Sequence, residues 1–188
     1  MHIAFNKDQI SFVRLELAAG EIPELLRKHA QRYPGTSGYE EQGAALIRNR
    51  FPPDDAKAFL EAVVRWGRGH RFVGRLLDQN DAIQITRALQ EAHVLLRSGQ
   101  TAAAVIRLQK LRYIGQSFAS KITRFLSPYT AVILDDVLRS ALGYRESQDG
   151  YEEFLRDCQT VLTRLISFHP QLRICDVEAA IFAKIQGY

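Results

Sequence analysis

Apolar residues recur along the chain at the three- and four-residue spacing of helices, and no convincing run alternates with the two-residue period of a strand. The first clear helix begins near Ile22, tolerates Pro23 in its first turn, and places Leu25, Leu26 and Ala30 on one face. Further helices are expected at about residues 39–49, 54–67, 81–97, 101–111, 116–126, 129–143, 150–168 and 174–186. The pattern therefore predicts an all-α fold.

Chain length and composition set the scale of this fold. With 188 residues, of which 46% are hydrophobic, the chain is long enough for one domain with a sizeable core. A helix that ends at Ser98-Gly99 indicates two small helical lobes, residues 1–98 and 99–188, within the single domain 1–188. We expect a cleft between these lobes.

The sequence lacks the features of membrane-spanning, secreted and zinc-binding proteins. No apolar run approaches the roughly 20 residues that cross a bilayer, and residues 1–8 carry no basic patch followed by an apolar core. Cys158 and Cys175 are too few to ligate a structural zinc, and the five histidines lack ligand spacing. We therefore expect a cytoplasmic protein with reduced thiols and no bound metal.

The charge is modest in total and uneven along the chain. The net charge is +4, but residues 101–145 hold seven Lys or Arg against two Asp, a net charge of +5. Arginine outnumbers lysine 19 to 6, and the planar guanidinium binds phosphate through two hydrogen bonds. This bias favours nucleic acid as a partner, although solvated arginine-rich helix faces would give the same counts.

The basic segment contains two stretches at a distinctive spacing. Leu-Arg-Tyr-Ile-Gly-Gln-Ser-Phe-Ala (residues 111–119) joins two predicted helices, and Val-Ile-Leu-Asp-Asp-Val-Leu-Arg (residues 132–139) follows. This arrangement resembles the helix-hairpin-helix superfamily of DNA glycosylases, which includes endonuclease III, the adenine glycosylase and the 8-oxoguanine DNA glycosylases. In that family the hairpin reads Leu-Pro-Gly-Val-Gly-x-x-x-Ala and an essential aspartate follows. Aligning Gly115 with the second glycine places Ala119 on the alanine, Asp135 on the aspartate and Arg139 on a basic residue one turn later.

The resemblance implies a fold, an activity and a partner. It implies a helix-hairpin-helix bundle, with the hairpin at residues 101–126, most like a compact 8-oxoguanine DNA glycosylase fold. It also implies a double-stranded DNA partner that carries a modified base, and with it a nucleoid-associated monomer that needs no cofactor. A glycine at a helix start lets backbone N–H groups approach a phosphate, and a base inside a duplex must be flipped out before its glycosidic bond is reached. The candidate DNA-binding residues are Arg112, Tyr113, Gly115, Gln116, Ser117, Arg124 and Arg139.

Departures from the family pattern leave the chemistry open. Arg112 and Tyr113 stand where the family has Pro and its first Gly, which makes the turn less permissive. Lyase members carry a lysine where this chain has Ser117, and serine also stands there in the adenine glycosylase branch, which favours a hydrolase. Lys121 lies one helical turn after Ser117 on the same face. It is a candidate nucleophile that would form a Schiff base with the sugar C1′, with a phosphate contact or a solvated charge as the alternative.

Alternatives also remain for the acids and for one aromatic residue. Asp135 is the candidate catalytic carboxylate, and Asp136 takes its place if the loop is one residue longer in register. Either acid would also serve as the N-cap or first-turn acid of the helix that follows. Phe182, on the last helix, is a candidate for stacking on the extruded base, as an aromatic in that region does in the 8-oxoguanine branch. Core packing is the alternative role for Phe182.

These observations together predict a DNA glycosylase, a hydrolase with or without lyase activity on abasic sites. It would flip out 8-oxoguanine or another modified base and cleave the N-glycosidic bond in base excision repair. One alternative is a non-catalytic helix-hairpin-helix module that binds DNA and uses Asp135 only as a cap. The other is a glycosylase that removes hypermodified bases from viral DNA in defence.

Overall fold

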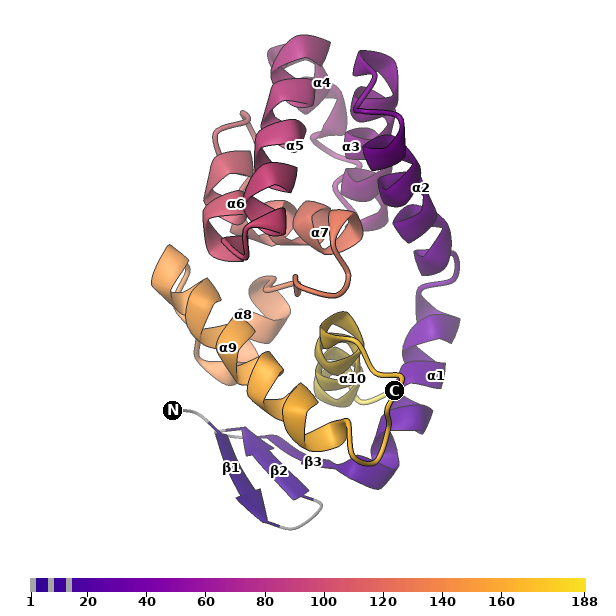
Figure 1. Cartoon of the computed structure of the whole chain (residues 1–188), viewed down its shortest axis with the longest axis vertical. Helices are drawn as coiled ribbons and strands as arrows, with labels where there is room; N and C mark the ends of the chain where they lie inside the picture. The colour runs from indigo at the N-terminus through magenta and orange to yellow at the C-terminus, as the bar shows by residue number, and fades with distance from the viewer. Residues whose placement is uncertain (1–2, 7–8, 13–14) are drawn as a thin grey trace.

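The computed structural model describes residues 3–6, 9–12 and 15–188. Three short strands, β1 (Ile3–Asn6), β2 (Gln9–Phe12) and β3 (Leu15–Ala18), form an antiparallel sheet in the order β1-β2-β3. Ile10 and Leu17 lie opposite each other on β2 and β3, and both are buried. The sheet lies at one end of the molecule, near the N-terminus (Figure 1).

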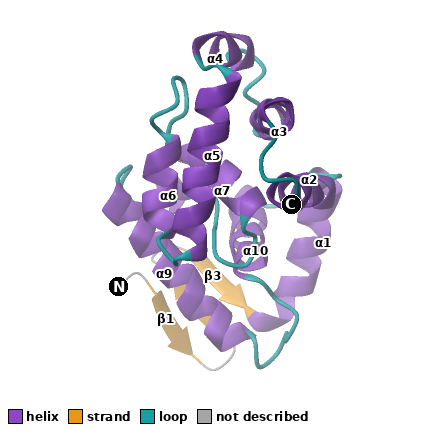
Figure 2. Cartoon of the chain, turned by 45° about the horizontal axis from the view of Figure 1, so that its top comes forward, coloured by secondary structure: helices purple, strands orange, loops and turns teal. Residues whose placement is uncertain are grey.

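Helices make up most of the remaining chain (Figure 2). A short 3-10 turn at Ala19–Glu21 leads from β3 into the first of them. The α-helices of the described residues are α1 (Ile22–Arg32), α2 (Thr36–Arg48), α3 (Pro53–Trp66), α4 (Val73–Gln79), α5 (Ala82–Arg97), α6 (Thr101–Leu108), α7 (Gln116–Leu126), α8 (Asp136–Leu142), α9 (Gln148–Leu165) and α10 (Ile174–Gln186). The predicted all-α fold is confirmed, with the small N-terminal sheet and α4 as elements that the sequence pattern did not indicate. Within the described ranges, no helix combines the length and the apolar character that a membrane span requires.

The helices pack as two groups, which Figure 1 shows above and below the middle of the molecule. In the upper group α5 packs on α3 and α6, and α7 contacts α2, α3, α5 and α6. In the lower group α1 packs on α10, which also contacts α8, α9 and β3. This grouping differs from the expected lobes 1–98 and 99–188. The N-terminal segment returns to pack with the C-terminal helices, and α5 packs on α6 across the expected boundary.

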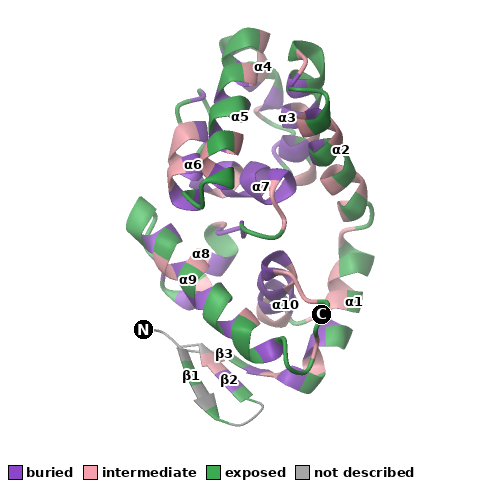
Figure 3. Ribbon diagram, in the orientation of Figure 1, coloured by how far each residue is buried: buried purple, intermediate pink, exposed green. Residues whose placement is uncertain are grey.

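Two helices form the centre of the protein. Every residue of α7 from Ala119 to Leu126 is buried, and α10 is buried from Ile174 to Ala183 except at Asp176 (Figure 3). The buried stretch of α7 includes two cations, Lys121 and Arg124. Because a buried charge is costly unless it is paired, these two side chains must find partners inside the fold.

The segment between α7 and α8 is extended where a helix was predicted. The expected helix at 129–143 is reduced to α8, and residues 131–135 run as an extended connection in which Ala131 to Leu134 are all buried. A short apolar run that is buried on all sides does not distinguish a helix from an extended chain. This connection runs from α7 of the upper group to α8 of the lower group (Figure 1), and Asp135 is its last residue.

Candidate active site

The hairpin that the sequence predicts is formed by α6, a short loop and α7. In the loop Tyr113 has a positive φ of 68°, the left-handed conformation that glycine adopts most readily. The Asn80 side chain holds this loop, because it accepts from the Arg112 N–H at 2.9 Å and donates to the Arg112 carbonyl at 3.1 Å. The backbone therefore bends as a glycine-containing turn would, and the Tyr113 side chain remains half exposed on the loop.

Lys121 projects from the middle of α7 and is enclosed by three groups. Its Nζ donates to Ser117 Oγ at 3.0 Å and lies 3.2 Å from Asp135 Oδ2. The same ammonium lies 5.5 Å from the centre of the Phe118 ring. Only 8% of the Lys121 side chain is exposed. The expected return of this lysine to Ser117 is therefore observed, and a freely solvated charge is excluded by its burial.

Asp135 uses its two carboxylate oxygens for different purposes. Oδ1 accepts from the backbone N–H groups of Val137 and Leu138, at 3.1 and 3.2 Å, and so caps the start of α8. Oδ2 faces Lys121. The extended segment that leads to Asp135 is fixed in turn, since Ser120 Oγ accepts from the Leu134 N–H at 3.2 Å. The capping role is therefore real, but it accounts for only one oxygen of this carboxylate.

A cavity of about 150 Å³ opens beside the Lys121–Asp135 pair. It is smaller than the roughly 300–1,000 Å³ of pockets that hold drug-sized ligands, and a single planar base is an occupant of suitable size. The cavity is lined from five parts of the chain by His29, Tyr33, Trp66, Gly67, Arg68, Lys121, Ile133, Asp135, Val137, Glu178, Phe182 and Gln186.

Aromatic rings form much of the cavity wall. The Tyr33 ring lies 5.6 Å from Trp66 and 5.9 Å from Phe182, measured between ring centroids, and it stacks on His29 at 5.0 Å. Two of these rings come from the C-terminal end of α1, one from α3 and one from α10. The two groups of helices therefore meet at the cavity. Such a wall offers flat, apolar surface to a planar ligand.

Two buried titratable groups in the cavity have shifted pKa values. Burial raises the pKa of Glu178 from 4.5 to about 8, with Asp135 acting in the same direction and Arg124 against it. Burial also lowers the pKa of His29 to about 4, and the charge of Arg124 adds to this effect. At neutral pH both side chains are therefore largely uncharged.

The remaining residues predicted for the site lie in several places. Asp136 is exposed outside the cavity and pairs with Arg139 at 3.2 Å, so it does not stand in for Asp135. Arg112 donates to Gln79 at the surface. Phe182 lies in the cavity wall, where both predicted roles, core packing and stacking on a base, are compatible with its position.

Two residues that were predicted to contact DNA are buried in the structure. Arg124 is 5% exposed and forms an ion pair with Glu40 of α2 at 2.6 Å. Gln116, at the start of α7, is also buried. Both lie on a helix that is packed on nearly all sides, so neither side chain reaches a DNA surface without unfolding its surroundings.

Several cavity residues were not foreseen from the sequence. His29, Tyr33 and Gly67 come from helix ends that are far from the hairpin in the sequence, and no local pattern marks them. Glu178 did carry a signal, because it is a lone acid within the apolar stretch 177–183 of a helix. A charged residue at a position that the helix must bury indicates a partner or a function.

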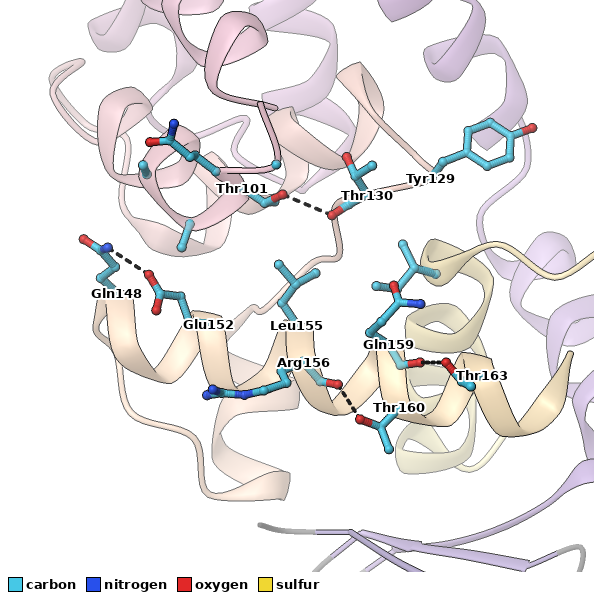
Figure 4. Close-up of a pocket in the computed structure, with 15 residues that line it drawn as sticks. Thr101, Tyr129, Thr130, Gln148, Glu152, Leu155, Arg156, Gln159, Thr160 and Thr163 are labelled. Atoms are coloured by element: carbon cyan, nitrogen blue, oxygen red, sulfur yellow. Dashed lines mark hydrogen bonds between the residues drawn. The ribbon is translucent and has the colours of Figure 1, made fainter. Parts of the chain in front are cut away.

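A larger groove of about 720 Å³ lies elsewhere, between α6 and α9 (Figure 4). Several of its polar side chains form hydrogen bonds within α9: Thr160 and Thr163 donate to backbone carbonyls, and Gln148 donates to Glu152. The groove includes neither Lys121 nor Asp135. In the described ranges no cluster of three or more His, Cys, Asp or Glu side chains is arranged to hold a metal ion.

Residues 43–182, well over half of the chain, match the family model described as "Putative 8-oxoguanine DNA glycosylase OGG-like protein". The matched range includes the hairpin, Lys121, Asp135 and Phe182, and it leaves out His29 and Tyr33. Searches of curated proteins and of solved structures gave no match. Family match, helical architecture and hairpin agree, and the chain belongs to the OGG-like family of DNA glycosylase-related proteins.

Proposed function

We propose that this protein is a DNA glycosylase that receives an extruded base in the cavity and cleaves its N-glycosidic bond with Lys121 and Asp135. The observation that carries the proposal is the pairing of the Lys121 ammonium with Asp135 Oδ2 at 3.2 Å, in the wall of a base-sized aromatic cavity. An amine and a carboxylate held together beside a planar pocket suit nucleophilic attack on a sugar carbon. The substrate is double-stranded DNA with a modified base.

The reaction begins with a proton transfer inside the pair. Lys121 Nζ passes a proton to Asp135 and then attacks C1′ of the deoxyribose, while the C1′–N bond breaks and its electron pair leaves with the base. The base takes the proton from Asp135, whose regained negative charge stabilises the cationic sugar. Opening of the sugar ring gives a Schiff base between Lys121 and C1′. Hydrolysis by water then releases the amine and leaves an abasic site.

The water-dependent alternative uses the same residues differently. In a purely hydrolytic enzyme, Asp135 would stabilise the cationic sugar and a water would attack C1′, with Lys121 only balancing the charge of Asp135. Lys121 is enclosed and lines the cavity, and its Nζ lies 3.0 Å from Ser117 Oγ; this position favours the amine as nucleophile. The serine at position 117, which favours a hydrolase by family pattern, acts here as a hydrogen-bond acceptor for that amine.

Borohydride trapping separates the two versions of the chemistry. Reduction during turnover should leave a covalent protein–DNA adduct in the wild type and in Lys57→Ala, a matched change at an exposed lysine of α3. Lys121→Ala should give no adduct. A Lys121→Ala protein that still releases base at the wild-type rate, without an adduct in the wild type, would establish the hydrolytic version.

The catalytic reading itself is tested by abasic-site formation. Asp135→Asn should lower base release by a factor of about 100 or more, and Asp136→Asn should leave it near the wild-type rate. The substrates are duplexes that each carry one modified base opposite each partner, with 8-oxoguanine first because the family description names it. Preference for 8-oxoguanine supports repair, and activity confined to viral hypermodified bases supports defence. Binding without base release by any variant would instead indicate a non-catalytic DNA-binding module.

A further inference from the structure

Arg68 occupies an unusual backbone position at the end of α3. The Gly69 N–H donates to the Val64 carbonyl at 2.8 Å, and the Arg68 N–H donates to the Arg65 carbonyl at 2.9 Å. These are the two hydrogen bonds of a Schellman motif, which requires a left-handed residue at the position of Arg68. Arg68 accordingly has a φ of 66°. Glycine suits this position best, so the fold itself gives no reason for an arginine here.

The left-handed conformation of Arg68 alone does not indicate a binding site, because Arg50 has the same conformation at the end of α2. Its φ is 59°, and the Phe51 N–H donates to the Leu46 carbonyl in the same pattern. Both arginines are exposed. The difference is their place in the molecule: Arg68 lines the cavity that contains Lys121 and Asp135, and Arg50 does not.

The surroundings of Arg68 bring its charge to the mouth of this cavity. The preceding Gly67 lies against the Lys121 side chain so closely that a Cβ there would be 2.9 Å from Lys121 Cδ. The Arg68 guanidinium carbon lies 6.0 Å from the centre of the Tyr33 ring, a cation–π contact that holds the side chain beside the cavity. Among the described residues no acidic group forms an ion pair with Arg68, and a second arginine, Arg32, shares the neighbourhood of Tyr188 with it.

We propose that Arg68 binds the DNA backbone phosphate next to the extruded nucleotide. The proposal rests on the proposed function, which places the base in the cavity. Base and phosphate belong to one nucleotide, so a base that enters the cavity leaves its phosphate at the mouth. There the Arg68 guanidinium, without an acidic partner in the described chain, offers two parallel hydrogen bonds to the phosphate oxygens.

The test compares Arg68→Gly with the matched variant Arg50→Gly. Each gives a left-handed position the residue it prefers, so both proteins should unfold at or above the wild-type midpoint. Binding is measured with two labelled duplexes, one with a tetrahydrofuran abasic analogue and one intact. Arg68→Gly should lose about tenfold in affinity for the analogue duplex and little for the intact one. The slope of log affinity against log salt should fall by about one for the analogue duplex only.

Arg50→Gly should bind both duplexes as the wild type does. Arg68→Lys, which keeps the charge and loses the fork of donors, should fall between the wild type and Arg68→Gly. Equal losses on the two duplexes, or equal losses in Arg68→Gly and Arg50→Gly, would overturn the proposal, because each points to general charge attraction.

The binding readout also separates this proposal from the proposed function. If the wild type releases no base but prefers the analogue duplex in an Arg68-dependent way, the phosphate contact is supported and the glycosylase activity is refuted. If the wild type releases base and Arg68→Gly binds the analogue duplex as the wild type does, the glycosylase activity is supported and the phosphate contact is refuted.

Discussion

Gly67 leaves the space that Lys121 occupies, and Gly67→Ala tests how closely the protein must hold that lysine. Gly67 has a φ of −73°, which any L-residue adopts, so an alanine brings no backbone strain. Its Cβ, however, would lie 2.9 Å from Lys121 Cδ and 2.9 Å from Phe118 Cε1. Carbon atoms in contact prefer about 3.5–4.0 Å, so the neighbours must retreat by roughly 0.6–1 Å.

The lysine is the neighbour that gives way. Phe118 is held by an edge-to-face contact with Phe72 at 5.0 Å, whereas the Lys121 side chain has four rotatable bonds. The free energy of unfolding should therefore fall by only about 1 kcal/mol, the low end of the range for overpacking. A displacement of about 1 Å in a catalytic group lowers rates by up to about 100-fold. We expect base release to slow by about 10- to 100-fold, which is about 1.4–2.7 kcal/mol in the barrier.

The assay is single-turnover base release with enzyme in excess, together with DNA affinity and urea denaturation. The affinity should stay near the wild-type value, because Gly67→Ala removes no charge. Gly74→Ala is the matched control: a Cβ at this α4 residue meets nothing within 4 Å, so it should stabilise the protein slightly and leave the rate unchanged. A wild-type rate for Gly67→Ala would refute the reasoning, since the placement of the amine would then not limit the chemistry.

Two further predictions concern stability. Tyr113→Gly should raise the free energy of unfolding by about 1 kcal/mol, because it relieves the left-handed backbone of the hairpin loop, and a loss of stability in urea denaturation would contradict that strain. Glu178→Gln tests the buried carboxyl, whose pKa is raised from 4.5 to about 8 by burial. A group with a raised pKa in the folded state loses its contribution as pH rises through that value, so the stability of Glu178→Gln relative to wild type should increase between about pH 4.5 and 8 and then level off. A difference that does not change over this range would show that Glu178 ionises as it does in the unfolded chain.

The hairpin and its aspartate could be predicted from the sequence because each depends on local chemistry. Gly115 is the N-cap residue of α7, and Asp135 is the N-cap residue of α8, where its carboxylate accepts from backbone N–H groups of the first turn. Both features need only a few neighbouring residues to be identified. The approach of Lys121 to Ser117 is equally local, because residues one turn apart on a helix face the same way.

The features that the sequence did not predict depend on contacts between segments that are distant in the sequence. Arg124 has the same charge as the other arginines that the sequence predicts to bind DNA, and its removal from that set follows from its ion pair with Glu40, a residue of α2. The strands are four residues each, too short for an alternation to stand out, and they form a sheet only by pairing with one another. His29 and Tyr33 enter the site because α1 packs on α10, a contact that no local pattern indicates.

The position of the Lys121 amine in space depends on the direction of its side chain as well as on its residue number. A helical side chain points back toward the N-terminus of its helix, so a lysine extends over the preceding turn. Lys121 does so, and its Nζ reaches Ser117 Oγ, at the residue where lyase members of the superfamily carry their lysine. From there Nζ also meets Asp135 Oδ2. A lysine one turn later can therefore deliver its amine to the same region of the cavity, provided that the opposite wall leaves space for its methylene chain. Gly67 provides that space, since any side chain there would overlap Lys121. Ser117, Lys121 and Gly67 thus form one arrangement, in which Ser117 accepts from the amine and Gly67 leaves room for the methylene chain.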